Sequence, residues 1–584
     1  MLPALLALAI WAPPALAAAD ANKVLRLSFE VAETGFDPVR VSDGNSATIN
    51  EAIFERLLTY DYLARPARLM PMAAEAMPEV SDGGRTYTFR LRKGILFTPD
   101  PAFKGVPREL VAQDFVYTFM RYFDPKNRAP YAFLLEGKIK GLDDLGAAAR
   151  KSGKFNYDAK LPDLEAVDRY TLRIHLVRGD FNFPYIAAHT TFGVMAREVV
   201  EAYGGEVEAH PVGTGAYMLK EWKRASLIVL EANPLYRGFT WDFQGNPGDK
   251  WDDILIAAMK GKTMPQIGRV EISIIIEYQV QWLSFRQKQS DLLNLPSSFR
   301  TEAFEPDDTL KPALIDEQIA VYSFIDPEII YAFFNMQDPV VGGFTKEKIA
   351  LRRAMIMAYK IREDIDVIRR GMAVAAEMPV PQGVVGHDPQ YRSLNQRDPD
   401  LANRLLDRFG YKKGADGYRM TPDGKPLVVR YASSGSVVDR EHNELWKKSM
   451  DVIGIHMEFD VAPFVENLKA AKVCQLMMWE SAWGADYPDG DNFMQLLYGP
   501  NTGQSNNGCY QSKAFDAFYE KSREIPDSPE RNRLFLEMSR QMEVDGAWSL
   551  QLSRERRWLM RPWVRGFKRH PILHAEYQYM DIQP

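Results

Sequence analysis

Hydrophobic and polar positions along this chain follow two periods. Residues 86–91 (TYTFRL) and 170–176 (YTLRIHL) alternate at every second position, which predicts strands with one buried face. Residues 111–122 (VAQDFVYTFMRY) and 441–453 (EHNELWKKSMDVI) carry apolar side chains at helical spacing, which predicts amphipathic helices. Such segments continue to alternate along the chain, and no fixed-period repeat is visible. This order predicts an α/β architecture.

The first residues form an apolar run with a different meaning. Residues 2–19 (LPALLALAIWAPPALAAA) end in small side chains, and the first charge is Asp20. This pattern is typical of a secretory signal peptide, which we expect over 1–19 with cleavage after Ala17 or Ala19. The Pro13-Pro14 pair argues against a membrane span. Since no cysteine lies near the cleavage site, a lipid anchor is not expected, and we predict a soluble periplasmic protein.

Charge and cysteine content exclude two further classes of protein. The net charge is −6, and no block of five like charges occurs, so a nucleic-acid partner is not expected. The two cysteines, Cys474 and Cys509, form neither a C-x-x-C motif nor a Cys/His cluster, which argues against structural zinc. They are either two buried thiols or one disulfide, and export from the cytoplasm favours the disulfide.

Motifs for catalysis are largely absent. The chain has no nucleophile elbow, no S-x-x-K, no H-E-x-x-H and no P-loop. The acidic run from Asp486 to Asp491 lacks the glutamate that an EF-hand places at position twelve. This run could supply the paired carboxylates of a glycosidase, with Trp479 and Trp483 as sugar platforms. A carbohydrate-active enzyme therefore remains an alternative, but we expect no enzyme, no catalytic residue, no cofactor and no metal.

Six segments, in this order, carry a resemblance to a known family. They are residues 55–61 (ERLLTYD), 71–94 with the hairpin SDGGRTYTFRLRKG, 110–121 (LVAQDFVYTFMR), 211–217 (PVGTGAY), 348–360 (KIALRRAMIMAYK) and 483–489 (WGADYPD). Each motif is weak alone, but their common order and spacing are specific. Over essentially the whole mature chain, the sequence resembles the extracellular solute-binding proteins of family 5, the peptide- and nickel-type receptors of ABC importers.

The resemblance implies a type II periplasmic binding protein of the large three-domain kind. Lobe one is expected to comprise residues 24–66, 192–318 and 550–584, with an inserted domain over 67–191. Lobe two is expected over 319–549. The two chain crossings, near 318 and 549, would form the hinge about which the lobes close on a ligand.

The resemblance also implies site residues. In oligopeptide-binding relatives, the aspartate of the W-x-A-D-Y motif pairs with the α-ammonium group of the peptide, and Asp486 is the matching position. Trp483 would form a wall of a side-chain pocket, and Phe464 matches an aromatic pocket residue. The other predicted contacts are Ala485 and Tyr487 in the same motif, and Asn45 and Ser46 in a loop of lobe one. A turn, a core position or a helix cap would explain several of these residues equally well.

One departure from the oligopeptide branch concerns the substrate. Three residues before Trp483, that branch has an arginine that can bind the carboxylate of the peptide, whereas this chain has Glu480. An acid at this position favours a cationic ligand, or a longer peptide whose carboxylate lies elsewhere. The expected function is a monomeric periplasmic receptor that delivers peptides or peptide-like solutes to a membrane permease. A receptor for an oligosaccharide or an amino-acid derivative is the alternative.

Overall fold

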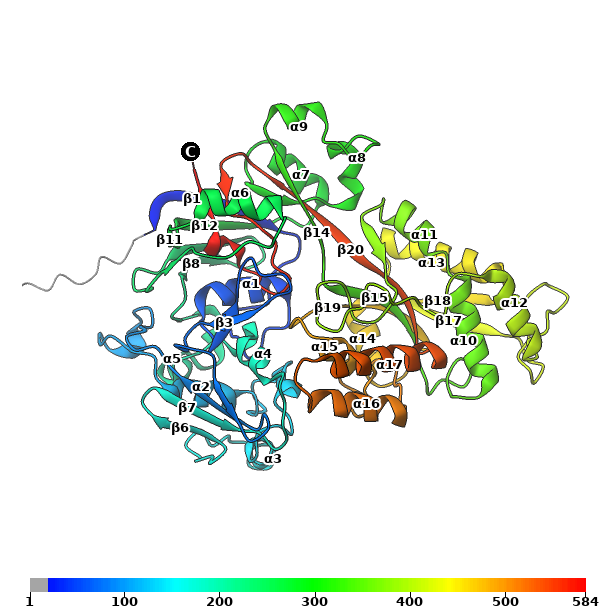
Figure 1. The fold of residues 1–584 in the computed structure, drawn as a ribbon, viewed down its shortest axis with the longest axis horizontal. Helices are drawn as coiled ribbons and strands as arrows, with labels where there is room; N and C mark the ends of the chain where they lie inside the picture. Colours follow the sequence, from blue (N-terminus) through cyan, green and yellow to red (C-terminus); the bar gives the residue numbers. More distant parts are fainter. Residues whose placement is uncertain (1–18, 584) are drawn as a thin grey trace, which may run out of the picture.

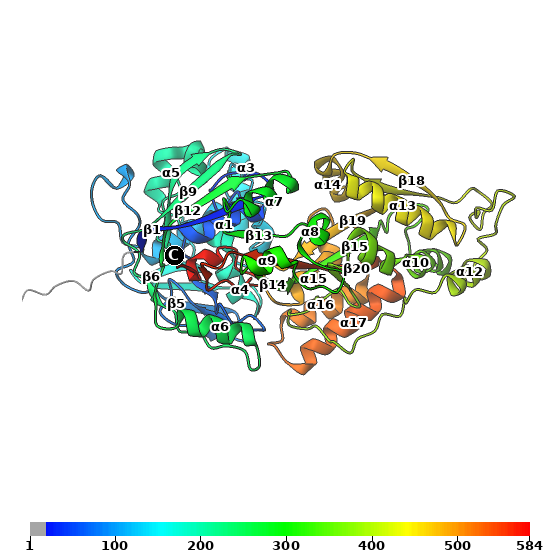
Figure 2. The same cartoon turned by 90° about the horizontal axis from the view of Figure 1, so that it is seen from above.

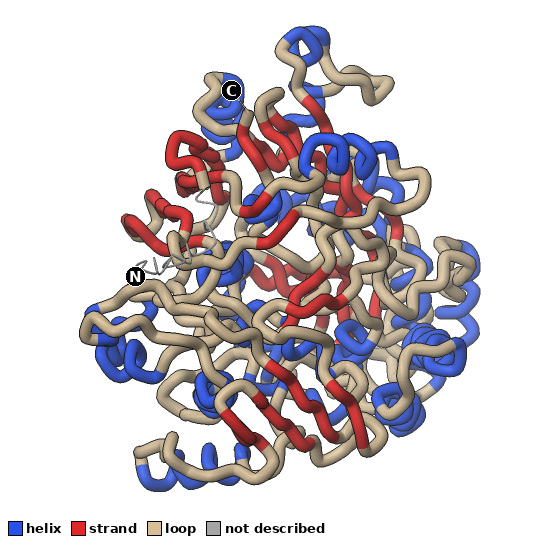
Figure 3. The backbone as a smooth tube through the Cα atoms, turned by 60° about the vertical axis from the view of Figure 1, so that its left-hand side comes forward, coloured by secondary structure: helices blue, strands red, loops and turns tan. Residues whose placement is uncertain are grey.

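The chain folds into two lobes joined by two extended crossings. A computed structural model describes residues 19–583, so residues 1–18 of the predicted signal peptide lie outside the described part. Figure 1 shows the N-terminal lobe on the left and the other lobe on the right, and Figure 2 shows the same division from above. In Figure 3 the strands form separate groups, with helices around them. None of the helices in the described residues is long and apolar enough to span a membrane.

The N-terminal lobe contains two four-stranded sheets. The first has the order β1 (Asp20–Phe29), β12 (Ile267–Ile274), β9 (Leu227–Ala232) and β8 (Tyr217–Lys223), and β1 runs parallel to β12. Next to it lies α1 (Gly44–Ile53), followed by β2 (Leu58–Tyr60) and β3 (Leu69–Pro71). The buried side chains of this sheet, among them Leu25 and Val270, belong to the largest apolar core.

The second sheet confirms the alternating strands. Its order is β4 (Glu79–Ser81), β5 (Thr86–Arg90), β7 (Thr171–His175) and β6 (Leu164–Asp168), all antiparallel. Tyr87 and Phe89 of β5 are fully buried, as the two-residue period predicts. Helix α2 (Ala112–Arg121) packs on β6 and β7, and its predicted helical spacing is confirmed. Short helices follow: α3 (Leu142–Ser152), α4 (Phe183–Ala188) and α5 (Arg197–Tyr203).

A mixed sheet of eight strands forms the C-terminal lobe and extends through the second half of β20 (Trp548–Met560) into the N-terminal lobe. Its main path is β13 (Leu292–Asn294), β20, β15 (Glu328–Phe334), β19 (Met478–Gly484), β17 (Val428–Ser433) and β18 (His456–Val461). Strand β15 is buried along its whole length: Ile329, Tyr331 and Phe333 enter one apolar core, and Ala332 and Phe334 enter the other. Because both faces are covered, its sequence is a continuous apolar run.

Helices cover both faces of this sheet. The principal ones are α10 (Lys346–Ala358), α12 (Pro399–Arg408), α13 (Val437–Asp451), α14 (Phe464–Lys472), α16 (Lys513–Arg523) and α17 (Pro529–Asp545). Helices α16 and α17 pack against each other, next to the short α15 (Asp491–Met494). The N-terminal lobe also carries α6 (Lys250–Met259), α7 (Tyr278–Arg286) and two shorter helices, α8 (Arg300–Ala303) and α9 (Pro312–Asp316).

One long strand and one short link connect the lobes. The first half of β20 pairs with β15, from Phe333↔Trp548 to Ile330↔Leu552. Its second half pairs with β14 (Ala320–Ile325), in a register that runs from Ile325↔Glu555 to Ala320↔Met560. The second crossing is the link from β14 to β15, where the Arg556 guanidinium donates to Asp326 at 2.7 Å. Both crossings lie side by side in Figure 1.

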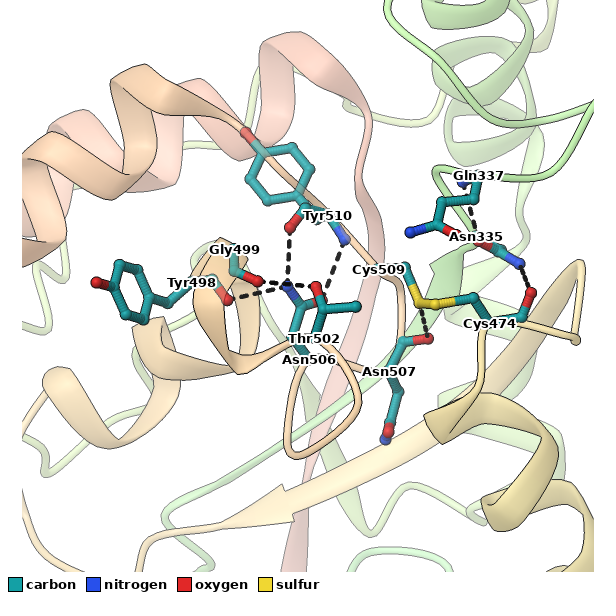
Figure 4. The surroundings of a disulfide bond; sticks show 10 residues. All are labelled: Asn335, Gln337, Cys474, Tyr498, Gly499, Thr502, Asn506, Asn507, Cys509 and Tyr510. Carbon is teal, nitrogen blue, oxygen red and sulfur yellow. Dashed lines mark hydrogen bonds between the residues drawn. A yellow bond between two sulfur atoms is a disulfide. The ribbon is translucent and has the colours of Figure 1, made fainter. Parts of the chain in front are cut away.

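A disulfide joins two loops of the C-terminal lobe. Cys474, after α14, is bonded to Cys509, and their Cα atoms are 6.1 Å apart (Figure 4). Asn335 donates to the Cys474 carbonyl oxygen at 2.7 Å. Close by, the side chain of Asn506 donates to the carbonyl oxygens of Tyr498 and Tyr510 at 3.1 and 2.8 Å. The loop around Cys509 is thereby fixed both covalently and by hydrogen bonds.

Candidate ligand-binding cleft

Two adjoining cavities lie where the lobes face each other. The smaller, of about 220 Å³, is lined by Val41–Gly44 and His189–Thr191 of the N-terminal lobe and by Gly484–Asp486 of the other lobe. The larger, of about 610 Å³, is lined by the ends of β1 and β20 and by the C-terminal segment. Gly44, Gly484 and His574 line both cavities, so the two adjoin each other in one cleft between the lobes.

Asp486 faces the smaller cavity and is held by a buried asparagine. Asn492, which is fully buried, donates from Nδ2 to Asp486 Oδ2 at 2.9 Å and accepts the Asp486 backbone N–H at the same distance. The Asp486 side chain is 15% exposed. Within residues 19–583, only Oδ2 of this carboxylate accepts a hydrogen bond, so Oδ1 has its acceptor capacity free for a ligand.

His189 lies close to the free oxygen. Its Nε2 lies 3.8 Å from Asp486 Oδ1. Its Nδ1 accepts the Thr191 backbone N–H at 3.3 Å, which places the proton of the neutral ring on Nε2, toward Asp486. His574 also lines the cavity, and burial, together with the charge of Arg569, lowers its pKa to about 3. His574 is therefore neutral at the pH of the cell exterior.

The segment that carries Asp486 is fixed by a buried ion pair at Asp489, three residues further along the chain. Arg531 of α17 donates to both oxygens of Asp489, at 2.6 and 2.7 Å, and both side chains are 2% exposed. The Arg531 Nε donates to the Ser522 carbonyl oxygen at 2.8 Å. Asn182 of the N-terminal lobe also donates to Asp489 at 3.3 Å. These contacts tie the loop to α16, to α17 and to the opposite lobe.

The other predicted contacts of the W-x-A-D-Y motif lie in different surroundings. Ala485 lines the cavity beside Asp486. Trp483 is half-buried, and its indole N–H donates to Asn492 at 3.1 Å. Tyr487 is 4% exposed, donates to Asp491 at 2.6 Å and stacks on Tyr185 of the N-terminal lobe, with ring centroids 5.8 Å apart. Tyr487 therefore contributes to the contact between the lobes, whereas the prediction placed it against a ligand.

The two predicted residues of the N-terminal lobe also differ from each other. Asn45 lines the larger cavity, and its side chain donates to the Val31 carbonyl oxygen at 2.5 Å. Ser46 is fully buried, and its hydroxyl accepts the Thr34 backbone N–H at 2.9 Å. Because Asp43 is the residue that caps α1, the helix turns Ser46 inward. The position of Ser46 does not fit the predicted ligand contact.

Phe464 and Glu480 lie at a third cavity, of about 210 Å³, on the C-terminal lobe. Phe464 begins α14 and is 61% exposed, with its ring centroid 5.5 Å from that of Trp479. Glu480 lies on β19, four residues before the end of the strand at Gly484. This third cavity and the Asp486 cavity thus lie at opposite ends of the same short stretch of β19.

That stretch of β19 has one open edge. Strand β15 pairs with β19 over its whole length, but β17 pairs with it only at Met478 and Trp479. In the described structure no strand pairs with the other edge of residues 480–484. Ala482 and Gly484 are exposed there. An exposed edge offers backbone N–H and C=O groups to an added strand.

No pattern in the sequence marked three residues that shape the cleft. His189 lies in a segment without a motif, and it reaches Asp486 only through the packing of one lobe on the other. Asn492 and Arg531 support Asp486 and its loop from within the C-terminal lobe. The spacing of Asn492, six residues after Asp486, could have suggested a loop contact, but nothing local marks His189 or Arg531.

Known proteins resemble this chain over nearly its whole length. The oligopeptide-binding protein OppA of Escherichia coli (strain K12) is 25% identical over 555 residues, which cover 91% of this chain and 87% of that protein. Heme-binding protein A of Haemophilus influenzae is 24% identical over 86% of this chain and 82% of that protein.

Solved structures show the same fold. The periplasmic binding protein DppA of Helicobacter pylori, in complex with the peptide STSA, superposes with a TM-score of 0.72 at 20% identity and covers 96% of this chain and 98% of that one. OppA of Haemophilus influenzae, in complex with RPPGFSPFR, gives a TM-score of 0.71 at 19% identity, covering 97% and 99%. These likenesses confirm the predicted type II periplasmic binding protein fold, with several lobes.

The sequence model of one family matches residues 68–505, more than half of the chain. With the two-lobed fold and the cleft between the lobes, this match confirms the resemblance drawn from the six sequence motifs. The chain belongs to the bacterial extracellular solute-binding proteins of family 5.

Proposed function

We propose that this protein is a periplasmic receptor of an ABC importer, which captures peptides with a free amino end and delivers them to a membrane permease. It acts by binding alone, without catalytic chemistry of its own. The observation that carries the proposal is the Asp486 carboxylate, whose Oδ1 faces a cavity between the lobes just beyond the open edge of β19. An ammonium group and an extended main chain are the two features that all linear peptides share.

The physical argument rests on what each contact recognises. A half-enclosed carboxylate favours a cation, and the α-ammonium supplies three N–H donors. The open edge of β19 pairs with the backbone of an extended ligand whatever its side chains are. Affinity then comes from groups common to peptides, while the large neighbouring cavity leaves room for varied side chains. An oligosaccharide has no group that needs the Asp486 charge.

Closure of the lobes is part of the proposal. We take lobe one as residues 24–66, 192–318 and 550–584 with the inserted domain 67–191, and lobe two as residues 319–549. The stacked pair Tyr185–Tyr487 and the ion pair between Asp180 and Arg523, at 3.2 Å, lie between the lobes. They would hold the closed form, with β14–β15 and β20 as the hinge.

The remaining roles follow from the positions described above. Asp486 binds the ammonium group, Ala485 and Asn45 line its surroundings, and Phe464 lines a side-chain pocket. Trp483 positions Asn492, which in turn holds Asp486. Export by the signal peptide 1–19 would bring the receptor to the periplasm.

The test is calorimetric titration of the mature protein with a pentapeptide and with the same peptide N-acetylated. The free peptide is expected to bind, and acetylation is expected to weaken binding at least a hundredfold, because the charge of the ammonium group is lost. Asp486→Asn should weaken the free peptide alone. Asp400→Asn, the same change at an exposed position of α12, is the matched control. Equal affinity for both peptides would contradict the role of Asp486.

Native mass spectrometry of the protein as purified identifies the ligand class independently. Release of peptides with free amino ends is the expected result. Release of a sugar or of heme, without any peptide, would overturn the proposed substrate and leave the fold assignment intact.

A further inference from the structure

The third cavity, at the start of the open edge of β19, is lined by hydrogen-bond acceptors. It is bounded by α13, α14 and β19, with a volume of about 210 Å³. Asp439, Asn443 and Glu480, whose side chains carry acceptor oxygens, are among its lining residues. Among its lining residues there is no lysine and no arginine; His442 is the only basic one. The charge of the cavity is therefore set mainly by two carboxylates.

Two of these acceptors have no hydrogen-bond partner in the described structure. Glu480 Oε2 is buried without a donor, and its Oε1 is 3.8 Å from Arg369 Nη2 and 3.9 Å from His442 Nδ1, both beyond hydrogen-bond distance. Asn443 is 9% exposed, and its Oδ1 is also without a donor. A buried acceptor without a donor is costly, so such a pair next to a cavity indicates a group that supplies N–H donors.

The Asp439 carboxylate keeps its charge despite its partial burial. Burial raises the pKa of Asp439, but the hydroxyl groups of Ser434 and Ser436 donate to it and bring the pKa below its usual value. His442 makes its closer contact elsewhere, with Asp364 at 3.3 Å, so it only partly balances Glu480. A cation in this cavity would meet two carboxylates, one of them with the Arg369 guanidinium at 3.8 Å, and no lysine or arginine among the lining residues.

The walls of the cavity suit a cation on a long apolar stem. The Phe464 ring, 61% exposed, and the Trp479 ring form one side, and Tyr431 lies in the lining as well. Aromatic faces attract ammonium and guanidinium groups and also pack against methylene groups. The combination of aromatic and acceptor-bearing lining residues distinguishes this cavity from a purely apolar pocket.

We infer that this cavity binds a basic side chain of the ligand, lysine or arginine, and that Glu480 determines this specificity. The inference rests on the proposed function, because it assumes a peptide paired along β19. From Gly484 back to Glu480 the strand spans about 13 Å, at roughly 3.3 Å per residue. A peptide with its amino end at Asp486 therefore brings its third to fifth residue to this cavity.

The test compares pentapeptides of alanine that carry one lysine at each of positions two to five with the same peptides carrying norleucine. Norleucine retains the four-carbon stem without the charge. Calorimetry of the wild-type protein should show lysine binding at least tenfold tighter than norleucine at one position. In Glu480→Gln this ratio should fall below threefold. Glu458→Gln, an exposed glutamate of β18 that is 3.5 Å from Arg430, should leave the ratio unchanged.

The outcomes separate the two proposals. If lysine and norleucine peptides bind equally at every position, or if Glu480→Gln keeps the preference, the cavity does not select a basic side chain, while the peptide function stands. If no peptide of the series binds, the proposed function fails and this inference fails with it. The wild-type ratio decides the matter even if Glu480→Gln does not fold, which circular dichroism reveals.

Discussion

Replacement of Arg531 by methionine tests whether a buried ion pair holds the segment that carries Asp486. The guanidinium donates to both carboxylate oxygens of Asp489 within 2.7 Å, and each side chain is only 2% exposed. Without Arg531, the carboxylate of Asp489 keeps the side chain of Asn182 and the backbone N–H of Asp491 as donors, at 3.3 and 2.9 Å. Its charge would then have no counter-charge in direct contact.

The expected loss is about 3–5 kcal/mol of unfolding free energy, the range for removing one partner of a buried pair. Methionine replaces the aliphatic part of arginine, so little of the loss comes from packing. This is a large share of the roughly 5–15 kcal/mol that stabilises a typical protein. Urea-induced unfolding followed by tryptophan fluorescence measures the change. Peptide affinity should fall as well, because the loop of Asp486 loses its support.

A matched control is an exposed ion pair of the same helix, α17, with α16. Lys521 of α16 and Glu530 of α17 form an ion pair at 3.0 Å whose side chains are 54% and 53% exposed. Solvent screens such a pair, so Lys521→Met should hardly move the urea midpoint. The double variant Arg531→Met/Asp489→Leu should recover much of the lost stability, since no charge remains buried. A loss in Arg531→Met no larger than that in Lys521→Met would refute the reasoning.

Three further changes are expected to have measurable effects. Reduction of the disulfide, whose cysteines are 35 residues apart, should lower the unfolding free energy by about 3–4 kcal/mol in urea titrations. A loss near zero would show that the bond does not restrict the unfolded chain. Arg523→Gln removes the ion pair with Asp180 between the lobes and should weaken peptide binding about fivefold. The radius of gyration of the free protein, measured by X-ray scattering, should rise. If neither quantity changes, this ion pair does not stabilise the closed form. Burial lowers the pKa of His442, but Asp364 and Glu480 outweigh burial and raise it. The stabilisation by His442 is thus fully present below about pH 6.5 and is lost as the pH rises through the raised pKa. His442→Gln should therefore lower the unfolding free energy more at pH 6 than at pH 9. An equal loss at both pH values would contradict the raised pKa.

Local periodicity predicted many elements of the fold. The strand over Thr86–Arg90 and the helix over Ala112–Arg121 follow from alternation and helical spacing in consecutive residues. Residues 329–334 of β15 are likewise a run of consecutive apolar residues. Its two-sided burial was not visible, because it depends on the two cores that pack on opposite faces of the sheet.

The candidate site was predicted in part. Asp486, which the W-x-A-D-Y motif marked as a ligand contact, lines the smaller cavity of the cleft. The sequence did not show that Ser46 turns inward or that Tyr487 packs between the lobes, because these directions depend on the cap of α1 and on the packing between the lobes. Sequence spacing alone does not determine these directions.

The sequence by itself determined the family, the order of strands and helices, and the acid at position 480, because these are properties of consecutive residues and of motifs in order. Only the tertiary structure brought His189 to within 3.8 Å of Asp486 and left Asn443 and Glu480 with unpaired acceptors in one cavity. The physical reason is that such contacts join residues far apart in the chain. They form only when sheets and helices pack, and no local pattern of residues encodes which side chains will then meet.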